Sequence, residues 1–575
     1  MVVVNQARPS PVKKPLIFTL SSSPGTATSA PKYAITVEIT AVMRNRIRKS
    51  VNGSGSLLPT DSMVPRRRSI AVFFCGGLLS AERSSSALSV AFRVLMRICC
   101  TSHINSALGF CRNVIRSTES ERTVSETHPN RPTSPTPPNP AFLQRMDAVV
   151  RDEIAAASPQ FPIEPGYPER DAVWGKVERN VEAVRADLEH IMRDLHANPE
   201  EAFQEFHAQA VIAKVLEGQG FVVKQGAHGV ETALRAEWQS DDFDPSTHPT
   251  VAVMSEYDAL PGIGHACGHN VIAASGVGGF LGAVGSGSGR IVFLGTPAEE
   301  GHTGKEYMIR GGMLDGVDCA VMIHPFCYDL VSHAWTGRRS LTATFTGVAA
   351  HASMQPYMGR NALDAATLAY QAMGLLRQQM PPSDRLHAII SDGGARASII
   401  PETATLSLYV RSLYTETLMD LSKRIDDILT GAALMTGTGV DVQWDNHPMS
   451  LPVRNNETLA ARWGATQQAR GREVLPGGIL PDSQAASTDF GNVSQLVPGI
   501  HPLVKIAPEG TALHTTKFAD AAITPAAMDG VIDSAVGLGQ VIADVLNDPV
   551  LLQRAREEFE AAGGAISVEA LLDEA

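Results

Sequence analysis

The sequence predicts an α/β protein in which a mostly parallel sheet is interrupted by a smaller α+β domain. Three apolar runs of strand type, at 250–254, 290–295 and 319–323, alternate with helical stretches, a pattern typical of a parallel sheet covered by helices. From about residue 336 the expected order becomes strand, helix, strand, strand, helix, strand, which is the split βαβ unit of a ferredoxin-like domain. We therefore expect the second domain to be inserted into the first.

The helices of the first domain are predicted by the spacing of apolar residues. Between Val177 and Leu195, apolar residues recur three and four positions apart, which places them on one stripe of a helix that ends before Pro199. A second helix is expected over 203–217, where glycines follow. Further helices are expected over 271–284 and 304–317 and, after the N-cap residue Thr524, from Pro525 to about Leu546.

The inserted domain opens with an alternating strand. Leu341, Ala343 and Phe345 alternate with threonines, which is the pattern of a strand with one buried face. The chain returns to the first domain after about residue 450. The remaining elements are expected as a helix over 362–380, strands over 385–391 and 398–410, a helix over 416–430 and a strand over 439–444.

The first 145 residues differ in composition from the rest of the 575-residue chain. They carry 19 Lys and Arg against 6 Asp and Glu, are rich in Ser and Pro, and show no sustained apolar period. We expect 1–145 to be disordered, either as a transit-type leader or as an upstream extension of a chain that starts at Met146. Order is expected to begin near Asp171.

The remaining residues, 146–575, are acidic, with 29 Lys and Arg against 54 Asp and Glu. This charge argues against nucleic acid or an anionic membrane as the main partner. Four of the seven cysteines lie in the leader, which suits a reducing compartment rather than a disulfide framework, so a cytoplasmic protein is expected. No run approaches the roughly 18 to 20 apolar residues that span a bilayer.

Side chains that bind metals or move protons follow each of the three apolar runs. Glu299 and Glu300 follow the second run, and His324 follows the third. Because the carboxyl ends of parallel strands meet at one edge of a sheet, we expect these groups to converge. The residues of this kind after the first run are Glu256, Asp258, His265, Cys267 and His269.

Three interpretations are open for the stretch "SEYDALPGIGHACGHN", residues 255–270. It is a metal site, a cysteine nucleophile with His265 or His269 as its base, or a glycine-rich turn. A metal site would account for all of the converging side chains, because thiolate and imidazole are good ligands for zinc. One of the two adjacent glutamates then binds the cation while the other takes a proton from water. His514, in "GTALHTTKFAD", is a candidate for a further ligand.

The motifs occur in the order and rough spacing of a known family. The segments "EYDALPGIGHACGHN", "GTPAEEG", "IHP", "GVAAHAS" followed by "GRNALDA", and "LHTTKFAD" resemble the aminoacylase and carboxypeptidase-type metallopeptidase family. The match is closest to the branch of auxin-conjugate amidohydrolases, p-aminobenzoyl-glutamate hydrolase and aminoacylase-1-like dipeptidases. The early "LHANPEEAFQEF" is also similar, and the resemblance covers about residues 170–550.

The resemblance implies a role for each matching residue. Glu299 matches the general base, and Asp258 matches an aspartate that supports the metal shell. His351 matches a histidine that, in dimeric members, reaches the partner subunit's site to bind substrate or steady the oxyanion. Arg411 lies where the family often has an arginine that holds the substrate carboxylate. The implied ligands of one or two divalent ions (Zn, Mn or Co) are Cys267, His269, Glu300, His324 and His514.

Two positions depart from the pattern of the wider family. Glu256 stands where that family has a ligand histidine, but this branch generally lacks the histidine, and Cys267 supplies a ligand instead. Ser398 stands where the family commonly has an asparagine. Because serine lacks the amide donor, the substrate contact at that position is expected to differ.

The resemblance also implies the fold and the activity. We expect a catalytic domain of zinc-peptidase type, made of 146–335 and 451–550, with an inserted ferredoxin-like lid and dimerisation domain over 336–450 and a C-terminal tail over 551–575. The expected enzyme is a homodimeric metallo-amidohydrolase that cleaves the amide bond of N-acyl amino acids, dipeptides or p-aminobenzoyl-glutamate-like substrates. A hydrolase with Cys267 as its nucleophile, and a catalytically inactive relative that binds a small amide, are the alternatives.

Overall fold

The computed structural model describes residues 35–36, 71–72, 134–157, 159–163 and 166–573. The chain divides into two compact units, Met1–Pro135 and Thr136–Ala575. In the first unit, strand β1 (Ile35–Thr36) pairs antiparallel with β2 (Ala71–Val72). The expectation that 1–145 is a disordered leader falls mostly on residues outside those described.

Helix α3 (Ala141–Ala156) lies before the point where order was expected to begin. Val150 of this helix is buried in one apolar cluster with Trp335 and Leu480, and Ile154, four positions on, packs against the same cluster. Residues four apart lie on one face of a helix, so α3 presents an apolar face to the rest of its unit. The prediction that order begins near Asp171 is therefore wrong.

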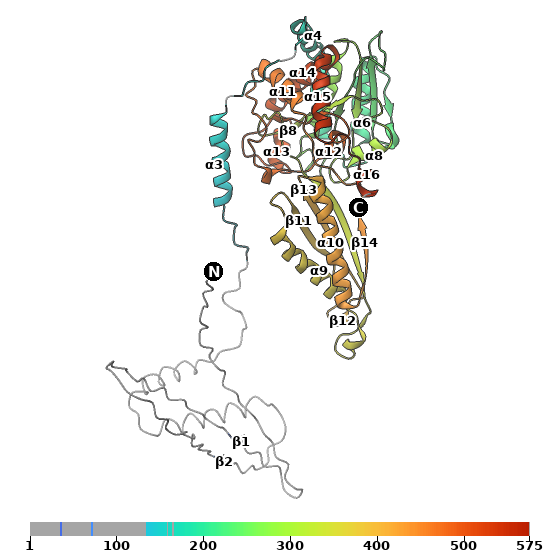
Figure 1. Cartoon of the computed structure of the whole chain (residues 1–575), viewed down its shortest axis with the longest axis vertical. Coiled ribbons are helices and arrows are strands. Elements are labelled where there is room, and N and C mark those ends of the chain that lie inside the picture. Colours follow the sequence, from blue (N-terminus) through green and yellow to red (C-terminus); the bar gives the residue numbers. More distant parts are fainter. Residues whose placement is uncertain (1–34, 37–70, 73–133, 158, 164–165, 574–575) are drawn as a thin grey trace, which may run out of the picture. The chain divides into compact units, whose positions relative to one another are not determined.

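The main sheet has six strands in the order β15-β7-β5-β6-β4-β3. The first four of these strands run parallel, and β7, β5 and β6 among them were predicted as parallel strands. The main domain is the upper part of Figure 1. No strand was predicted at β15, β4 or β3; β4 runs antiparallel to β6, and β3 runs antiparallel to β4 at the edge. The bounds are β3 (Lys224–Gln225), β4 (Leu234–Gln239), β5 (Thr250–Ser255), β6 (Arg290–Gly295), β7 (Cys319–Val321) and β15 (Gly499–Ile500). A separate parallel pair is formed by β8 (His324–Phe326) and β16 (Leu503–Lys505).

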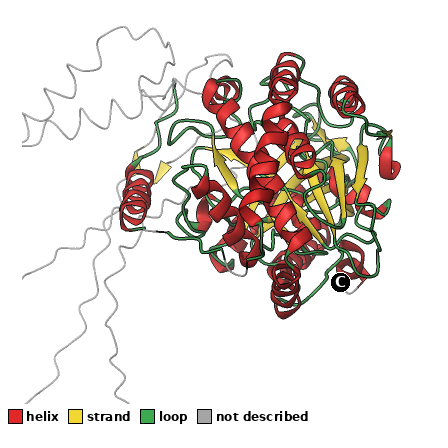
Figure 2. Cartoon of the chain, turned by 90° about the horizontal axis from the view of Figure 1, so that it is seen from above, coloured by secondary structure: helices red, strands yellow, loops and turns green. Residues whose placement is uncertain are grey.

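Helices pack across this sheet, as Figure 2 shows. The stripe between Val177 and Leu195 is buried as expected, but it lies on two helices that meet at Val184 rather than on one. The helix expected over 304–317 ends at Arg310. The helices of the main domain are α4 (Arg170–Ala183), α5 (Arg185–Ala197), α6 (Phe206–Gly218), α7 (His269–Ala283), α8 (Gly304–Arg310), α11 (Glu457–Ala469), α12 (Phe490–Ser494), α13 (Thr516–Ala521), α14 (Pro525–Asn547) and α15 (Pro549–Ala561).

Helix α7, which begins at a predicted site residue, is buried along its whole length against α14. The contact depends on glycine. A Cβ on Gly278 would lie 2.5 Å from Cβ of Ala535, and one on Gly279 would lie 2.8 Å from Cβ of Leu538. The two helices approach so closely that larger residues are excluded, and this fixes where the first turn of α7 lies.

Helix α14 is long and apolar enough to cross a membrane by length and composition. Asp529, Asp533 and Asp544 interrupt this helix, so it is not an unbroken apolar run. In addition, 83% of the most apolar window of α14 is buried inside the folded chain. Thr524 accepts a hydrogen bond from the N–H of Ala527 and caps the helix, as predicted. Burial of this extent is typical of a core helix in a folded domain.

The inserted domain has the predicted order of elements. Its antiparallel sheet has the strand order β11-β13-β9-β14, and two helices pack on one face of that sheet. The strand expected over 398–410 is two strands, because the chain turns at Pro401 and Glu402. The bounds are β9 (Gly337–Thr346), β10 (Ala350–His351), α9 (Ala362–Leu376), β11 (Arg385–Asp392), β12 (Ile399–Ile400), β13 (Thr403–Ser412), α10 (Thr415–Thr436) and β14 (Gly439–Trp444).

The segment expected as a C-terminal tail forms helices. Phe559 of α15 is buried, and Val568 of α16 (Val568–Asp573) is buried in the apolar core of the inserted domain. The end of the chain therefore packs on the inserted domain as well as on the main domain. Four short 3-10 segments complete the described elements: Ala227–Gly229, Pro356–Met358, Arg377–Gln379 and Asp482–Gln484.

Candidate metal centre

The loop after β5 carries Cys267 to the start of α7, where His269 is the first helical residue. Gly268 between them has φ of 80°, in the left-handed region that favours glycine. A Cβ at this position would also lie 3.0 Å from Cγ of Pro325. Glycine therefore permits the sharp turn that presents both the thiol and the imidazole to one site.

The loop after β6 carries Glu299 and Glu300. Within this loop, Ala298 is a non-glycine residue with φ of 60°. The N–H of Ala298 donates to Oε1 of Glu205 at 2.9 Å, and its C=O accepts from the N–H of Gly304 at 2.9 Å. Surrounding hydrogen bonds thus hold an unfavourable backbone conformation directly before the glutamate pair, as is common at functional sites.

His324 and His514 reach the same region from later parts of the chain. His324 is the first residue of β8. His514 has φ of 58°, and its N–H donates to C=O of Ala266 at 3.0 Å, next to Cys267. This backbone hydrogen bond ties the late loop to the turn that carries the thiol, so four separate segments meet at one place.

The structure brings the five predicted metal ligands and Glu299 into overlapping groups. Sγ of Cys267 lies 3.5 Å from Nε2 of His324, and Nε2 of His514 lies 3.3 Å from Oε1 of Glu300. Within each group, the candidate ligand atoms lie within 4.8 Å of one another. The groups are Cys267, His269 and His324; Cys267, Glu300 and His514; and His269, Glu299 and Glu300.

Asp258 fixes the orientation of His269. Nδ1 of His269 donates to Oδ1 of Asp258 at 3.0 Å, and Oδ2 of Asp258 accepts from the N–H of Glu300 at 2.9 Å. Burial alone would lower the pKa of His269, but Asp258 and Cys267 outweigh it and raise that pKa well above its usual value. One carboxylate therefore orients both an imidazole and the backbone of the glutamate pair, as outer-shell groups do in metal sites.

The polar atoms of this site fit a cation. Nε2 of His269, Oε1 of Glu300 and Oε2 of Glu256 are buried and have no hydrogen-bond partner among the described residues. Buried polar atoms without a partner are rare, because leaving them unpaired is unfavourable. A sulfur, imidazole nitrogens and carboxylate oxygens facing one point form a donor set that suits zinc or a related divalent ion.

The protonation tendencies of the site argue against a cysteine nucleophile that acts without a cation, and a thiolate ligand at the same position would need the charge of a cation to form. Burial and the nearby Glu300 raise the pKa of Cys267 well above its usual value, whereas a nucleophilic thiol needs a lowered pKa. Burial lowers the pKa of His324 to about 3, and its Nδ1 donates to C=O of Pro325 at 2.8 Å. His324 is therefore neutral near pH 7 and offers Nε2 as an electron-pair donor towards Cys267.

A buried charged triad that the sequence analysis missed lies behind the site. Lys305 pairs with Glu256 and, at 2.6 Å, with Oδ1 of Asp489, and all three side chains are fully buried. Burial opposes the charge on Lys305, but Asp489 and Glu256 outweigh it and raise the pKa of the amine. Glu256, whose second oxygen lies 3.5 Å from Nε2 of His269, is thereby held in place. No sequence pattern signals a contact between residues so far apart in the chain.

Three other candidate residues lie elsewhere. His351 is exposed on β10, which pairs with β12 at the end of the inserted domain farther from the main domain (Figure 1). Arg411 lies on β13 of the four-stranded sheet, at the opposite end of the inserted domain. His265 is buried beside His196, with ring centroids 6.5 Å apart, and burial lowers its pKa to about 3. The structure of one chain brings none of the three into the metal groups.

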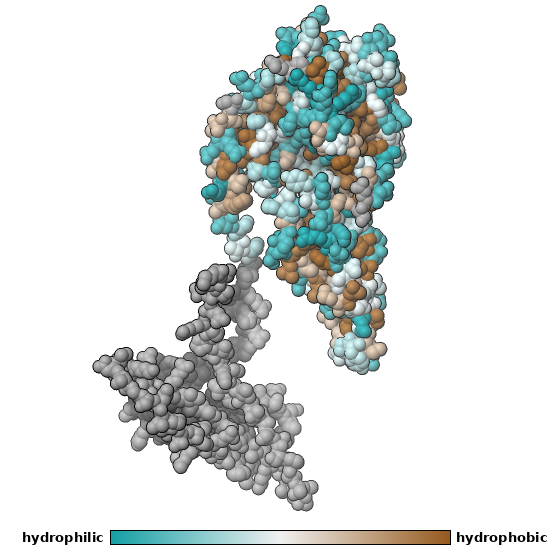
Figure 3. Space-filling view, viewed as in Figure 1, coloured by the Kyte–Doolittle hydropathy of each residue, from teal (hydrophilic) through white to brown (hydrophobic). Residues whose placement is uncertain are grey.

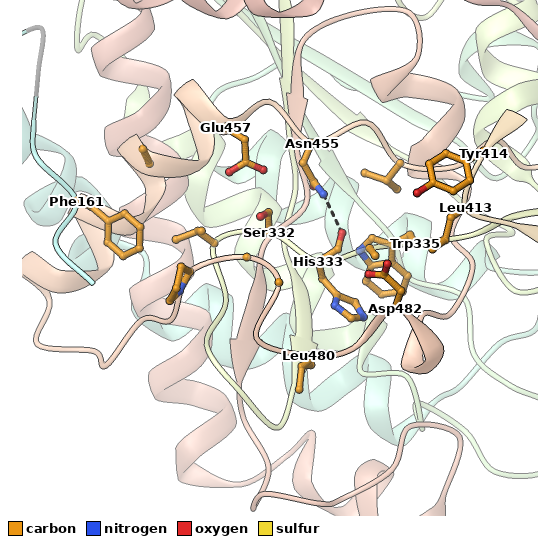
Figure 4. Close-up of a pocket in the computed structure, with 17 residues that line it drawn as sticks. Phe161, Ser332, His333, Trp335, Leu413, Tyr414, Asn455, Glu457, Leu480 and Asp482 are labelled. Carbon is orange, nitrogen blue, oxygen red and sulfur yellow. Dashed lines mark hydrogen bonds between the residues drawn. The ribbon is translucent and has the colours of Figure 1, made fainter. Parts of the chain in front are cut away.

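A pocket of about 550 Å³ lies where the inserted domain joins the main domain. Figure 4 shows His333 and Trp335 on one side of this pocket, where the side-chain amide of Asn455 donates to C=O of His333 at 2.8 Å. The ring of Trp335 lies 5.3 Å from that of His324. The side chain of Trp335 therefore lies between the pocket and His324 of the metal groups. No residue of the metal groups lines the pocket.

Adjacent glutamates beside sulfur and imidazole donors, at the edge of a parallel sheet, are the arrangement of a metal-dependent hydrolase. Comparisons with known proteins agree. Residues 335–434 match the model of a peptidase dimerisation domain. The chain is 34% identical to the Xaa-Arg dipeptidase of Mus musculus over 413 residues, which cover 69% of this chain and 95% of that protein. It is 28% identical to one of the subunits of p-aminobenzoyl-glutamate hydrolase from Escherichia coli (strain K12), with 68% and 95% covered.

A solved structure shows the same fold. The aminobenzoyl-glutamate utilization protein of Klebsiella pneumoniae superposes with a TM-score of 0.50 at 20% identity and covers 65% of this chain and 98% of its own. Together with the sequence matches, this likeness confirms the resemblance stated above. The chain belongs to the M20 family and is a metal-dependent hydrolase of amide bonds.

Proposed function

We propose that this chain hydrolyses the amide bond between an acyl or aminoacyl group and an amino acid with a free carboxylate, at a divalent metal centre. When bound, the cation polarises the amide carbonyl as a Lewis acid and lowers the pKa of a water. The residues that would hold it are Cys267, His269, Glu300, His324 and His514.

Glu299 is the proposed general base. Its side chain is 10% exposed, so it reaches incoming substrate from a largely buried position. Burial and the adjacent Glu300 raise its pKa well above the usual value, which favours uptake of a proton. Glu299 accepts a proton from the water that attacks the carbonyl and then gives it to the departing amine.

Arg411 is the proposed partner of the substrate's carboxylate. It is partly buried and forms no ion pair with a carboxylate of the described residues. A guanidinium binds a carboxylate through two parallel hydrogen bonds, which fixes the orientation of the ligand. The amide next to that carboxylate would then be directed towards the glutamate pair.

The proposed assembly is a homodimer formed through the inserted domain. Strand β11 lies at the edge of its sheet, and Ile389 and Ile390 on this strand are 62% and 38% exposed. An apolar, unpaired strand edge is a surface for association, and Figure 3 shows apolar residues gathered on this domain. In such a dimer, His351 of one subunit would bind the substrate carbonyl in the other subunit's site.

The observation that carries the proposal is the meeting of six ligand-type side chains, from four segments, within overlapping groups of 4.8 Å. The decisive experiment measures hydrolysis of a panel of dipeptides and N-acyl amino acids before and after chelation, with metal content determined on the same samples. We expect chelation to abolish activity and a divalent ion to restore it. Full activity in the metal-free protein would contradict the proposal.

The variant Glu299→Gln tests the proposed base. We expect turnover to fall by about 10² to 10⁴, the usual contribution of general acid–base catalysis, while metal content stays at the wild-type level. Glu217→Gln, at an exposed glutamate of α6, is the matched control and should keep full activity. Wild-type turnover in Glu299→Gln would rule out the assigned role.

The proposed setting is the cytoplasm, with small amides as partners. Three cysteines in the described part, Cys267, Cys319 and Cys327, are buried and unpaired, as expected in a reducing compartment. Fractionation of cells that express the chain with a C-terminal tag tests this placement. Recovery of the chain in an organelle or membrane fraction would contradict it.

A further inference from the structure

Three arginines lie side by side across the sheet of the inserted domain. In the strand register, Arg385 of β11 is opposite Arg411 of β13, and Arg411 is opposite Arg338 of β9. Residues directly opposite each other in antiparallel strands point to the same face of the sheet. The three guanidinium groups therefore form a continuous row, the arginine row, on one face.

The arginine row lies on the face that the helices of this domain leave open. On β13, Leu408 and Val410 are buried under α9 and α10, so the alternating residues Tyr409 and Arg411 point to the other face. Arg339 gives the contrast, because it alternates with Arg338 and points towards the helix side. There it is paired with Asp445 at 2.7 Å.

No carboxylate among the described residues forms an ion pair with any member of the arginine row. Their hydrogen bonds within the described part of the chain go to neutral groups: Arg385 donates to C=O of Asp384 at 2.8 Å, and Arg338 donates to Oγ1 of Thr303 at 3.2 Å. Burial and the neighbouring Arg338 lower the pKa of Arg411. Like charges directly opposite in a sheet are destabilising, so a bound anion would stabilise the row.

The arginine row borders a pocket at one end and contacts the loop after β6 at the other. A cavity of about 410 Å³ is lined by Arg385, Arg411 and Tyr409, with the exposed Asp482 among its other lining residues. At the other end of the row, Arg338 contacts Thr303, which lies three residues after Glu300. The row thus runs from the loop that carries the proposed base into an open cavity.

We propose that the arginine row is a subsite for two anionic groups, so that the preferred leaving group is a dicarboxylic amino acid. The inference rests on the proposed function, in which Arg411 binds the carboxylate of the leaving amino acid. Arg338 and Arg385, one strand away on either side at about 4.8 Å, bind its second carboxylate. A cationic side chain at this position is repelled, whereas a neutral amide loses the charge-assisted hydrogen bonds.

Three dipeptides that share an N-terminal alanine test the proposal on the full, metal-loaded chain. Alanyl-glutamate and alanyl-glutamine are nearly identical in shape and differ by one charge, and alanyl-arginine reverses that charge. We expect kcat/KM to be at least about tenfold higher for the glutamate substrate than for the glutamine one, and lowest for arginine. Equal rates for glutamate and glutamine, or a preference for arginine, would overturn the assignment.

Variants locate the effect in the arginine row. Arg338→Gln and Arg385→Gln should each raise KM for alanyl-glutamate by about tenfold and change the values for alanyl-glutamine by less than threefold. Arg424 is a charged residue of helix α10 that lies away from the open face. Arg424→Gln is the matched control and should change KM for neither substrate. An equal loss for both substrates would indicate a structural role and contradict the proposal.

Binding of free L-glutamate and L-glutamine, measured by calorimetry, separates this inference from the proposed function. Glutamate binding that depends on Arg338 and Arg385, with no hydrolysis of any dipeptide, would support the subsite and contradict the hydrolase. Hydrolysis without a glutamate preference in rate or in binding would support the proposed function and contradict the subsite.

Discussion

Nδ1 of His269 lies 3.0 Å from Oδ1 of Asp258, and this contact leaves Nε2 of the same ring free to face the metal groups. The hydrogen bond decides which nitrogen carries the proton and how the ring is turned. The other oxygen of Asp258 holds the N–H of Glu300. One carboxylate thus orients candidate ligands on two different segments.

The first prediction concerns this contact. In Asp258→Asn, an amide replaces one carboxylate oxygen, so either His269 or the N–H of Glu300 loses its acceptor. We expect metal affinity to fall by about 10- to 100-fold, measured by competition with a chelator of known affinity. Asp529→Asn, at an exposed aspartate on α14, should leave the affinity unchanged. An unaltered affinity in Asp258→Asn would show that the contact does not support the ligands.

The second prediction concerns the dimer and uses two inactive variants. Glu299→Gln lacks the proposed base, and His351→Ala lacks the histidine proposed to act in the partner's site. Co-expressing the two should restore part of the activity, because one site of a mixed dimer then contains both wild-type groups. The rates are compared with each variant expressed alone. No restoration, in a sample shown to contain mixed dimers, would place His351 outside the chemistry of the partner's site.

The third prediction concerns Glu205, which is fully buried and accepts hydrogen bonds from the N–H of Ala298 and from Oγ1 of Thr232. Burial and the nearby Asp258 raise its pKa to about 7. The folded state therefore favours the protonated carboxyl. Its contribution to stability is fully present below about pH 4.5 and is lost as the pH rises towards 7.

The size of that change is roughly 3 kcal/mol between pH 4.5 and 7, from 1.36 kcal/mol for each unit of pKa shift. Glu205→Gln has a neutral side chain of the same shape and should remove this pH-dependent part. Urea unfolding of both proteins across this pH range gives the free energy of unfolding. A constant difference between wild type and variant at every pH would contradict the prediction.

The fourth prediction concerns the contact between α7 and α14. Gly278→Ala places a methyl group 2.5 Å from Cβ of Ala535, so the helices must move apart. We expect a loss of about 1 to 3 kcal/mol in the free energy of unfolding, as for other overpacked cores. Gly374→Ala, also within a helix but with nothing within 4 Å of the added Cβ, should stabilise the chain by about 0.4 to 1 kcal/mol. Similar effects of the two changes would contradict the assigned contact.

Sequence patterns predicted the parts of this protein that depend on neighbours in the chain. The apolar runs before Glu256, Glu299 and His324 predicted three strand ends, and the geometry of a parallel sheet brings those ends together. The βαββαβ order of the inserted domain was visible for the same reason. The break at Val184 was missed because the apolar stripe continues through it.

Features that depend on distant parts of the chain were not predictable. Lys305 and Asp489 are 184 residues apart, and only the folded chain shows that they pair. The arginine row requires the strand register, because Arg338, Arg385 and Arg411 belong to three strands whose alignment no local pattern determines. Helix α3 was hidden by the proline-rich segment before it.

The backbone hydrogen bond from His514 to Ala266 joins the two portions of the main domain. In synthesis, Cys267 and His269 emerge well before His514, with the whole inserted domain between them. The donor set is therefore incomplete until the last quarter of the chain has left the ribosome. A cation held by Cys267, His269 and His514 would therefore link early and late segments of the chain, so metal binding would be coupled to completion of the fold.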